Sequence, residues 1–395
     1  MTEKRRVAIT GVGVVSPVGI GTEAYWQGLL APQPTEERRV HDFDPKDYYD
    51  DPKAIRRADR FEQFAVAASL QAVAQAGELT ADPERIGVLV GTGIGGVITH
   101  EAQTNVLENK GARRVSPFTV PMMMANAGAA AVSMRHGFQG PCETISTACA
   151  TGTHAIGTAA RWIQWGLCDA VIAGGSEAGM SGIAVAGFGN MKAMSPAGIS
   201  RPFDAGRDGF VISEGAGLLM LEEWSLAEAR GANILGEILG SASLADAHHI
   251  TAPAPEGRGA VRCMQAAMDD AGLTPDTIAH INAHGTSTPL NDAAEAQGIA
   301  QLFASPGPIV TSIKGVTGHS LGAAGALEAI AVLLSMQHGL IPPTDGLESY
   351  DPKLPLIDVV QKEARAWTPG PSLSNSFGFG GHNGTLVIGP ALGPA

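Results

Sequence analysis

The sequence has 395 residues, which exceeds the roughly 250–300 residues at which a single core usually stops growing, so we expect two domains or two halves. Its formal net charge of −13 argues against broad binding to nucleic acids or to an anionic membrane surface, and we expect neither as a partner. With 51 glycines, 44% hydrophobic residues and 5% aromatic residues, the composition suits a compact α/β enzyme with close packing of helices on sheets.

Two similar successions of strands and helices follow one another along the chain. Short β-branched runs bounded by glycine predict strands at residues 7–15, 87–90, 169–173, 217–221, 278–283, 309–313, 372–377 and 385–388. Alanine-rich stretches predict helices at residues 64–76, 152–165, 258–271 and 325–336. This order predicts two α/β halves with buried, largely parallel strands. Three further stretches read as long loops that could border a substrate channel or a partner: residues 31–58, 182–203 and 243–255.

The four cysteines do not form a metal-binding or disulfide pattern. Their positions, 142, 149, 168 and 263, lack the spacing of metal ligands, and a chain of this length does not need a disulfide framework. No stretch reaches about 18 uninterrupted apolar residues, so a membrane span is not expected. We expect a protein of a reducing compartment, the cytoplasm.

Cys149 stands where an apolar run ends and a predicted helix begins, within Thr147-Ala148-Cys149-Ala150. The free N–H groups and the dipole of a helix start favour a thiolate, so this position predicts a nucleophile with a lowered pKa. Two polar turns after predicted strands offer histidines for such a nucleophile, His284 and His319. By contrast, His154, His248, His249 and His382 lack such support, and we assign them no catalytic role.

Two other patterns suggest different chemistry. Residues 91–96 have the glycine spacing of a dinucleotide-binding loop, but no clear acidic partner follows on a second strand. Residues 318–322 match the nucleophile elbow of a serine hydrolase, with Ser320 as nucleophile. An acid at Asp345, Asp351 or Asp358 and then His382 would follow in the chain order that such hydrolases use. That elbow needs a strand running directly into the serine, whereas Lys314 to Thr317 intervene here. A serine hydrolase remains the alternative from another reaction class.

Four segments resemble the signatures of elongating β-ketoacyl-acyl carrier protein synthases of the synthase II kind. They are STACATG at residues 146–152, NAHGTSTP at 282–289, KGVTGHSLGAAGALE at 314–328 and NSFGFGG at 375–381. The resemblance covers almost the whole chain. It implies the thiolase fold, in which two duplicated α/β halves form a five-layer αβαβα sandwich. We place the N-terminal half at residues 1–240 with the cysteine, and the C-terminal half at residues 241–395 with the two histidines.

The resemblance also implies the reaction, a decarboxylative Claisen condensation of an acyl thioester with malonyl-acyl carrier protein. Cys149 would hold the acyl group, and the N–H groups of Cys149 and Phe379 would bind the oxyanion. His284 and His319 would donate to the enolate that forms as carbon dioxide leaves. Lys314 would supply a fixed positive charge. Glu328 would be its partner, or alternatively a solvated helix position.

Other residues would bind the substrate, which the family carries on the phosphopantetheine of the carrier protein, without a metal or a separate cofactor. The hydroxyls of Thr286 and Thr288 would receive the pantetheine arm, although Thr288 could serve only a structural turn. Phe188 and Phe210 would line the acyl pocket. Phe379 would act as a gate between the acyl and malonyl steps, or alternatively as a core aromatic residue.

A strongly acidic carrier protein must meet a local basic surface, because this chain is acidic overall. The family places its docking cations at Arg56, Arg57, Arg113, Arg114 and Lys192. The chain is shorter than the family pattern between Leu30 and Asp42, which leaves fatty-acid and polyketide or polyene elongation open. We expect a homodimer, or a heterodimer with a chain-length-factor subunit. A non-catalytic scaffold that binds acyl carrier protein is the remaining alternative.

Overall fold

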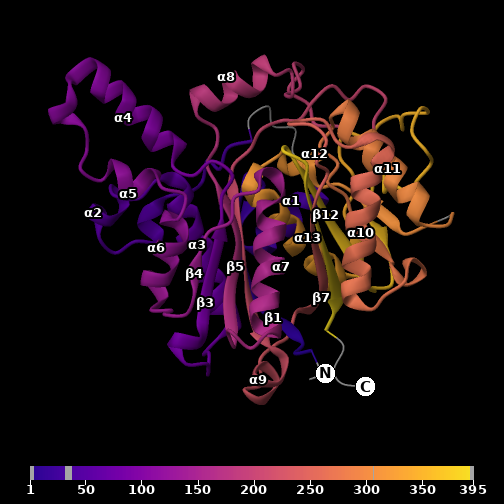
Figure 1. The fold of residues 1–395 in the computed structure, drawn as a ribbon, viewed down its shortest axis with the longest axis horizontal. Coiled ribbons are helices and arrows are strands. Elements are labelled where there is room, and N and C mark those ends of the chain that lie inside the picture. Colours follow the sequence, from indigo (N-terminus) through magenta and orange to yellow (C-terminus); the bar gives the residue numbers. More distant parts are fainter. Residues whose placement is uncertain (1–3, 32–37, 306, 392–395) are drawn as a thin grey trace.

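The computed structural model describes residues 4–31, 38–305 and 307–391, and their strands form one mixed 11-stranded sheet shared by two halves of the chain (Figure 1). From its outer edge inward, the first half contributes β4 (Cys142–Glu143), β3 (Ile86–Gly91), β5 (Ala170–Glu177), β6 (Gly215–Glu223) and β1 (Val7–Ser16), with β2 (Gly19–Ile20) beside β1. The second half continues with β7 (Gly236–Ala245), β13 (His382–Pro390), β12 (Ser372–Gly378), β8 (His280–Asn282) and β9 (Ile309–Thr311). Two residue pairs between β1 and β7 join the halves.

The two halves have the same strand order. Without the short strands β2, β10 and β11, each half has five strands, and outward from the junction they are the first, fifth, fourth, second and third in chain order. This agreement confirms the predicted duplication of an α/β unit.

Two helices lie between the sheet regions of the two halves and form the middle layer (Figure 1). The helix α7 (Thr151–Gln164) contacts β3 and β5 on one side and β7 and β13 on the other. Its neighbour α13 (Ala324–His338) likewise contacts β5 and β6 as well as β12 and β13. The outer layers are α3 (Arg60–Ala76) against the first half and α10 (Arg258–Ala271) against the second. The order of layers is therefore αβαβα.

Small residues allow the layers to approach closely. A Cβ atom at Gly13 of β1 would lie 1.9 Å from the carbonyl oxygen of Ala68 in α3, and one at Gly11 would lie 2.0 Å from that of Ala72. Only glycine fits where a helix backbone rests directly on a strand. The alanine-rich helices and glycine-rich strands of the sequence are thus two parts of one packing arrangement.

The remaining elements connect and cover this frame. They are α1 (Thr22–Leu30), α2 (Pro52–Ile55), α4 (Val97–Lys110), α5 (Thr119–Met123), α6 (Ala127–His136), α8 (Gly182–Asn190), α9 (Trp224–Ala229), α11 (Pro289–Leu302), α12 (Lys314–Thr317), β10 (Leu340–Ile341) and β11 (Arg365–Ala366). Two single-turn 3₁₀ helices, Ala148–Ala150 and Leu321–Ala323, lead directly into α7 and α13.

Some expectations need correction. The prediction of largely parallel strands is wrong: β3 is parallel to β4 and β5, and β8 to β9 and β12, but β1, β6, β7 and β13 run antiparallel to their neighbours. The expected loop at residues 182–203 begins with α8, and the expected loop at residues 31–58 includes α2, while its residues 32–37 lie outside the described residues. The division at residue 240 stays a prediction, and β7 runs across it.

One helical segment, Leu321–His338, is long and apolar enough to cross a membrane by length and composition. Within the structure 89% of this segment is buried, because it includes the middle-layer helix α13. Its apolar character follows from packing on both sides.

Candidate active site

Cys149 lies in the 3₁₀ turn that leads into α7, as predicted for a residue at a helix start. The preceding residue, Ala148, has a positive φ of 50°, a conformation that costs a non-glycine residue energy and recurs at functional sites. The Thr151 side chain stabilises this turn because its hydroxyl accepts from the Thr147 N–H at 2.8 Å and donates to the Ala148 carbonyl at 2.7 Å. The turn thus holds the cysteine in a fixed position at the base of a cavity.

The turn between β12 and β13 packs directly on the cysteine turn. A Cβ atom at Gly378 would lie 3.0 Å from the backbone nitrogen of Cys149, so the close approach requires glycine. The next residue, Phe379, directs its backbone N–H to the Cys149 sulfur. One of the two N–H groups that an oxyanion would need, that of Phe379, therefore lies close to the sulfur.

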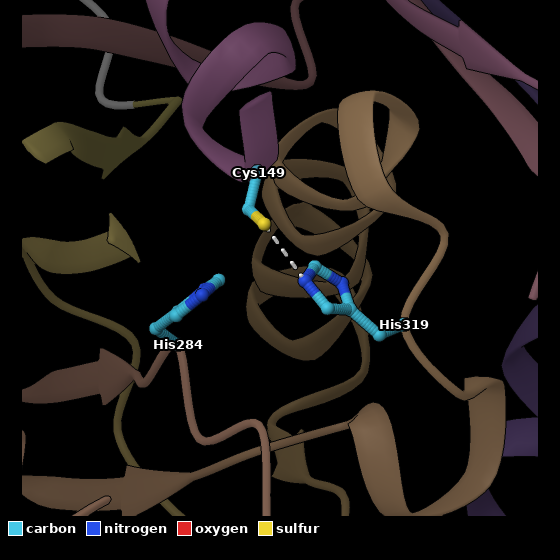
Figure 2. A group of neighbouring side chains, drawn as sticks. All are labelled: Cys149, His284 and His319. Carbon is cyan, nitrogen blue, oxygen red and sulfur yellow. Dashed lines mark hydrogen bonds between the residues drawn. The ribbon is translucent and has the colours of Figure 1, made fainter. Parts of the chain in front are cut away.

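His319 reaches the cysteine from the second half of the chain (Figure 2). Its Nε2 lies 3.0 Å from Cys149 Sγ. Two backbone hydrogen bonds fix the residue: its N–H donates to the Val211 carbonyl at 2.7 Å, and its carbonyl accepts from the Ser213 N–H at 3.0 Å. The ring of Phe210 packs edge-on against the imidazole, with 5.3 Å between the ring centres.

His284 follows β8 and also points toward the cysteine (Figure 2). The two imidazole rings lie nearly perpendicular, with 5.4 Å between their centres. A buried carboxylate that the sequence analysis missed, Glu295 of α11, accepts from the N–H groups of His284 and Gly285 at 2.8 Å each. No sequence pattern marked this position, because the helix that carries it was not among the predicted ones.

Lys314 and Glu328 form a buried ion pair behind the histidines. The Lys314 ammonium also donates to the His284 carbonyl at 2.7 Å and lies 3.3 Å from His284 Nδ1. Glu328 is 1% exposed, so its alternative as a solvated helix position is wrong. Because the ammonium donates to Nδ1, the proton of the neutral His284 ring resides on Nε2.

Burial has the largest effect on the pKa values of Cys149, His284 and His319. It lowers the pKa of His284 and His319 well below the usual value of 6.5, and the Lys314 charge acts in the same direction. Burial also raises the pKa of the Cys149 thiol to about 11, against the lowering effects of Lys314 and of the Phe379 N–H. The predicted lowering of this pKa is wrong, because the loss of water around the sulfur outweighs the groups that favour the thiolate. At neutral pH the site holds a thiol and two neutral imidazoles.

The Cys149 sulfur and one nitrogen of each histidine lie within 4.8 Å of one another. Such a donor set suits Zn²⁺. The Lys314 ammonium beside His284 opposes a divalent cation there, since like charges repel strongly in a buried site. We therefore interpret the three side chains as reacting groups.

A cavity of about 540 Å³ opens over the three side chains. It is lined by all four residues predicted to bind substrate, Thr286, Thr288, Phe188 and Phe210, and by Phe379. The hydroxyls of Thr286 and Thr288 lie 3.0 Å apart, and Thr288 also caps the start of α11. Phe188 meets Phe210 edge to face, with 5.5 Å between ring centres. Lys314 and Glu328 lie behind this lining.

The predicted docking cations lie on the surface. Arg56 and Arg57 are exposed after α2, and Arg113 and Arg114 are exposed in the loop that follows α4. The Arg57 guanidinium lies 4.3 Å from the centre of the Phe118 ring, which joins these two segments on one side of the first half. The exposed Lys192 stands apart from them in sequence and lines the cavity.

The glycine-rich loop at residues 91–96 and the serine at position 320 lack the geometry of the two competing reaction classes. The buried carboxylate of Glu177 accepts from the N–H groups of Gly93 at 2.6 Å and Ile94 at 3.2 Å, which a dinucleotide phosphate would need. Ser320 follows α12 and precedes a 3₁₀ turn, whereas a hydrolase elbow requires a strand before its serine. The structure therefore favours neither a dinucleotide-binding enzyme nor a serine hydrolase.

Comparisons with known proteins agree with this arrangement. The models of the β-ketoacyl synthase N-terminal domain and C-terminal domain match residues 33–227 and 235–348. A 3-oxoacyl-(acyl-carrier-protein) synthase 2 of Synechocystis sp. is 45% identical, covering 98% of both chains. The protein of the same name from Staphylococcus aureus is also 45% identical, covering 98% of this chain and 99% of its own.

Solved structures are similar over nearly the whole chain. An ishigamide ketosynthase/chain length factor structure has a TM-score of 0.92 at 33% identity, covering 99% of this chain and 100% of its own. A β-ketoacyl synthase from Burkholderia phymatum has a TM-score of 0.90 at 35% identity, covering 98% and 100%. A type II polyketide ketosynthase in complex with its acyl-carrier protein has a TM-score of 0.88 at 28% identity, covering 98% and 100%. These similarities confirm the predicted thiolase fold.

Proposed function

The chain belongs to the β-ketoacyl synthase family, and from this premise we propose that it condenses an acyl thioester with malonyl-acyl carrier protein to give β-ketoacyl-acyl carrier protein. The observation that carries the proposal is the convergence of Cys149, His284 and His319 at the base of one cavity. The chain is thus an acyltransferase of the Cys-His-His type.

Acyl transfer is the first step. As the Cys149 sulfur attacks the acyl thioester, its proton passes to His319 Nε2 at 3.0 Å. The N–H groups of Cys149 and Phe379 stabilise the oxyanion of the tetrahedral intermediate, and each such donor contributes about 3 kcal/mol. The carrier thiol leaves with the proton from His319. His319 returns to its neutral form, and the acyl group remains on Cys149.

Decarboxylation of the malonyl thioester supplies the carbon nucleophile. His284 donates its Nε2 proton to the thioester carbonyl and stabilises the enolate as carbon dioxide leaves. His319 also donates there, once its ring proton has moved from Nδ1 to Nε2. The enolate carbon attacks the acyl carbonyl on Cys149, and the cysteine departs as a thiolate that later regains a proton. Lys314 keeps His284 in the required tautomer, and Glu328 holds Lys314 in place.

The cavity wall supports roles for the remaining predicted residues. Thr286 and Thr288 bind the pantetheine arm, while Phe188 and Phe210 contact the acyl chain. Phe379 acts as the gate, because it lies between Gly378 and two glycines with positive φ, Gly380 at 84° and Gly381 at 73°. The pantetheine is part of the substrate, and the reaction needs no separate cofactor.

The partner is an acyl carrier protein, and Arg56, Arg57, Arg113, Arg114 and Lys192 form its docking surface. A solved relative is a ketosynthase in complex with its acyl-carrier protein, and another is a ketosynthase/chain length factor.

We propose that this chain works in the cytoplasm as a homodimer or beside a chain-length-factor subunit. The relatives named synthase 2 favour fatty-acid elongation, and the ketosynthase structures keep polyketide elongation as the second candidate. A purely scaffolding role would leave the whole catalytic group idle.

Mass spectrometry of the carrier protein tests the proposal. The purified chain is incubated with acyl-carrier and malonyl-carrier proteins of several acyl lengths. We expect a β-ketoacyl carrier two carbons longer than the acyl donor. Extension only after addition of a chain-length-factor subunit would support the polyketide candidate, and no extension with any partner would contradict the proposal.

A further inference from the structure

A buried histidine to which the sequence assigned no catalytic role, His154, links the cysteine turn to strand β13, which follows the turn that carries Phe379. It lies in α7, just past Cys149, and is 6% exposed. Its Nδ1 lies 2.9 Å from the Thr147 hydroxyl, and its Nε2 lies 3.0 Å from the Asn383 carbonyl oxygen. Both ring nitrogens therefore have a partner, one at the start of the cysteine turn and one in strand β13.

The partners determine which nitrogen carries the proton. A carbonyl oxygen can only accept, so Nε2 carries the proton and donates to Asn383. Nδ1 then accepts from the Thr147 hydroxyl. Burial lowers the pKa of His154, which favours this neutral ring. The imidazole is thus a rigid link with one donor and one acceptor.

Each end of the link holds a segment that presents one oxyanion N–H group. Thr147 directly precedes the strained Ala148, and Cys149 follows. Asn383 pairs with Phe377 across the β12–β13 turn, which carries Phe379 between them. The lack of a side chain at Gly384 leaves room for the His154 ring, because a Cβ atom there would lie 2.9 Å from that ring. A larger residue there would displace the histidine from its two partners.

We infer that His154 is a positioning residue that sets the spacing between the N–H groups of Cys149 and Phe379. This inference rests on the proposed function, in which those two groups bind the oxyanion during acyl transfer and condensation. Malonyl decarboxylation by the unacylated protein uses His284 and His319 instead. A weakened link should therefore slow acyl transfer and leave decarboxylation unchanged.

Two variants test the two ends of the link. Thr147→Val removes the hydroxyl that donates to Nδ1 while it keeps the shape of the side chain. His154→Gln keeps an amide donor for the Asn383 carbonyl and loses the ring contact with Thr147. The matched control is Thr153→Val, which removes the buried hydrogen bond from the same helix to Ser376 at 2.8 Å. Thermal unfolding of each variant reports any general loss of stability.

The measured quantities are the rate of Cys149 acylation by an acyl carrier and the rate of malonyl decarboxylation without an acyl donor. We expect both test variants to acylate about ten- to a hundredfold more slowly, below the roughly hundred- to thousandfold loss from removing an oxyanion donor, and to decarboxylate at the wild-type rate. The double variant should be no slower than the slower single one, since both changes break one link. Equal loss of both rates, unchanged acylation, or the same change in Thr153→Val would overturn the inference. If the wild-type chain performs neither step, the proposed function itself fails.

Discussion

The starts of the two middle-layer helices occupy equivalent places in the duplicated fold but carry different chemistry. Both α7 and α13 begin after a 3₁₀ turn, and each turn has a non-glycine residue with positive φ, Ala148 at 50° and Leu321 at 48°. The first turn presents Cys149, and the second begins two residues after His319. Only next to the second does the described structure place the buried pair Lys314–Glu328.

This difference indicates a division of labour between the halves. In the proposed mechanism the first half holds the acyl group, and the second half holds the two imidazoles and the charged pair that keeps one of them oriented. Two helices that pack against each other bring these halves of the reaction within 4.8 Å. The following changes test whether the division is real.

Cys149→Ala should have the largest effect, because it removes the function of the first half. We expect condensation to fall by at least about 10⁴-fold, since a covalent nucleophile is lost. Malonyl decarboxylation should persist, because His284 and His319 remain in place. Parallel assays of extended carrier and released carbon dioxide check this; loss of both activities would show that the halves do not act separately.

His284→Ala should give the opposite pattern. Removing one donor to the enolate should slow decarboxylation about 10²–10³-fold. Acylation of Cys149 should continue, because His319 remains beside the sulfur. Rapid-quench mass spectrometry of the acyl adduct separates the two rates. Acylation that slows as much as decarboxylation would contradict the division.

Lys314→Met should destabilise the fold by about 3–5 kcal/mol, because it leaves Glu328 buried without its partner. Burial already raises the pKa of Glu328 to about 7, above its ordinary 4.5. A carboxyl group whose pKa is raised in the folded protein lowers the free energy of unfolding as the pH rises through that pKa. The loss of stability in Lys314→Met should therefore be greater at pH 8 than at pH 6. Urea unfolding at both pH values measures it. The control Lys314→Met/Glu328→Leu should recover most of the stability at both; a loss independent of pH would exclude ionised Glu328 as the cause.

Alkylation of Cys149 should depend steeply on pH. With a thiol pKa of about 11, the thiolate fraction should rise roughly tenfold per unit between pH 7 and pH 10. Peptide mapping after iodoacetamide treatment distinguishes Cys149 from the exposed Cys142. An alkylation rate that levels off near pH 7 would instead indicate that the helix start affects the pKa of this thiol more strongly than burial does.

Charge reversal at the docking surface should have the smallest effect. Arg56→Glu/Arg57→Glu should raise KM for the carrier protein about three- to tenfold with little change in kcat, since exposed charges act mainly on encounter. The control Arg258→Glu/Arg262→Glu makes the same charge change on exposed positions of α10 in the other half. Equal effects of both pairs would indicate net charge rather than docking at this surface.

The sequence predicted local features better than relationships between segments. Runs of apolar and glycine residues correctly indicated most strands and all four alanine-rich helices, because these depend on neighbours in the chain. The antiparallel pairing of β1, β6, β7 and β13 depends on contacts far apart in sequence. The ionisation of Cys149 was mispredicted for the same reason, since its local position favours a thiolate but long-range packing removes its water. Glu295 and His154 belong to no local sequence motif, and their roles can be recognised only from the residues that they contact in the fold.

Intact-protein mass spectrometry with an acyl carrier alone shows whether Cys149 is the residue that takes up the acyl group. We expect one acyl group per chain, located by peptide mapping on Cys149 and removed when malonyl carrier is added. Cys149→Ala treated in the same way should remain unmodified. An acyl group on another residue, or equal acylation of Cys149→Ala, would exclude Cys149 as the nucleophile.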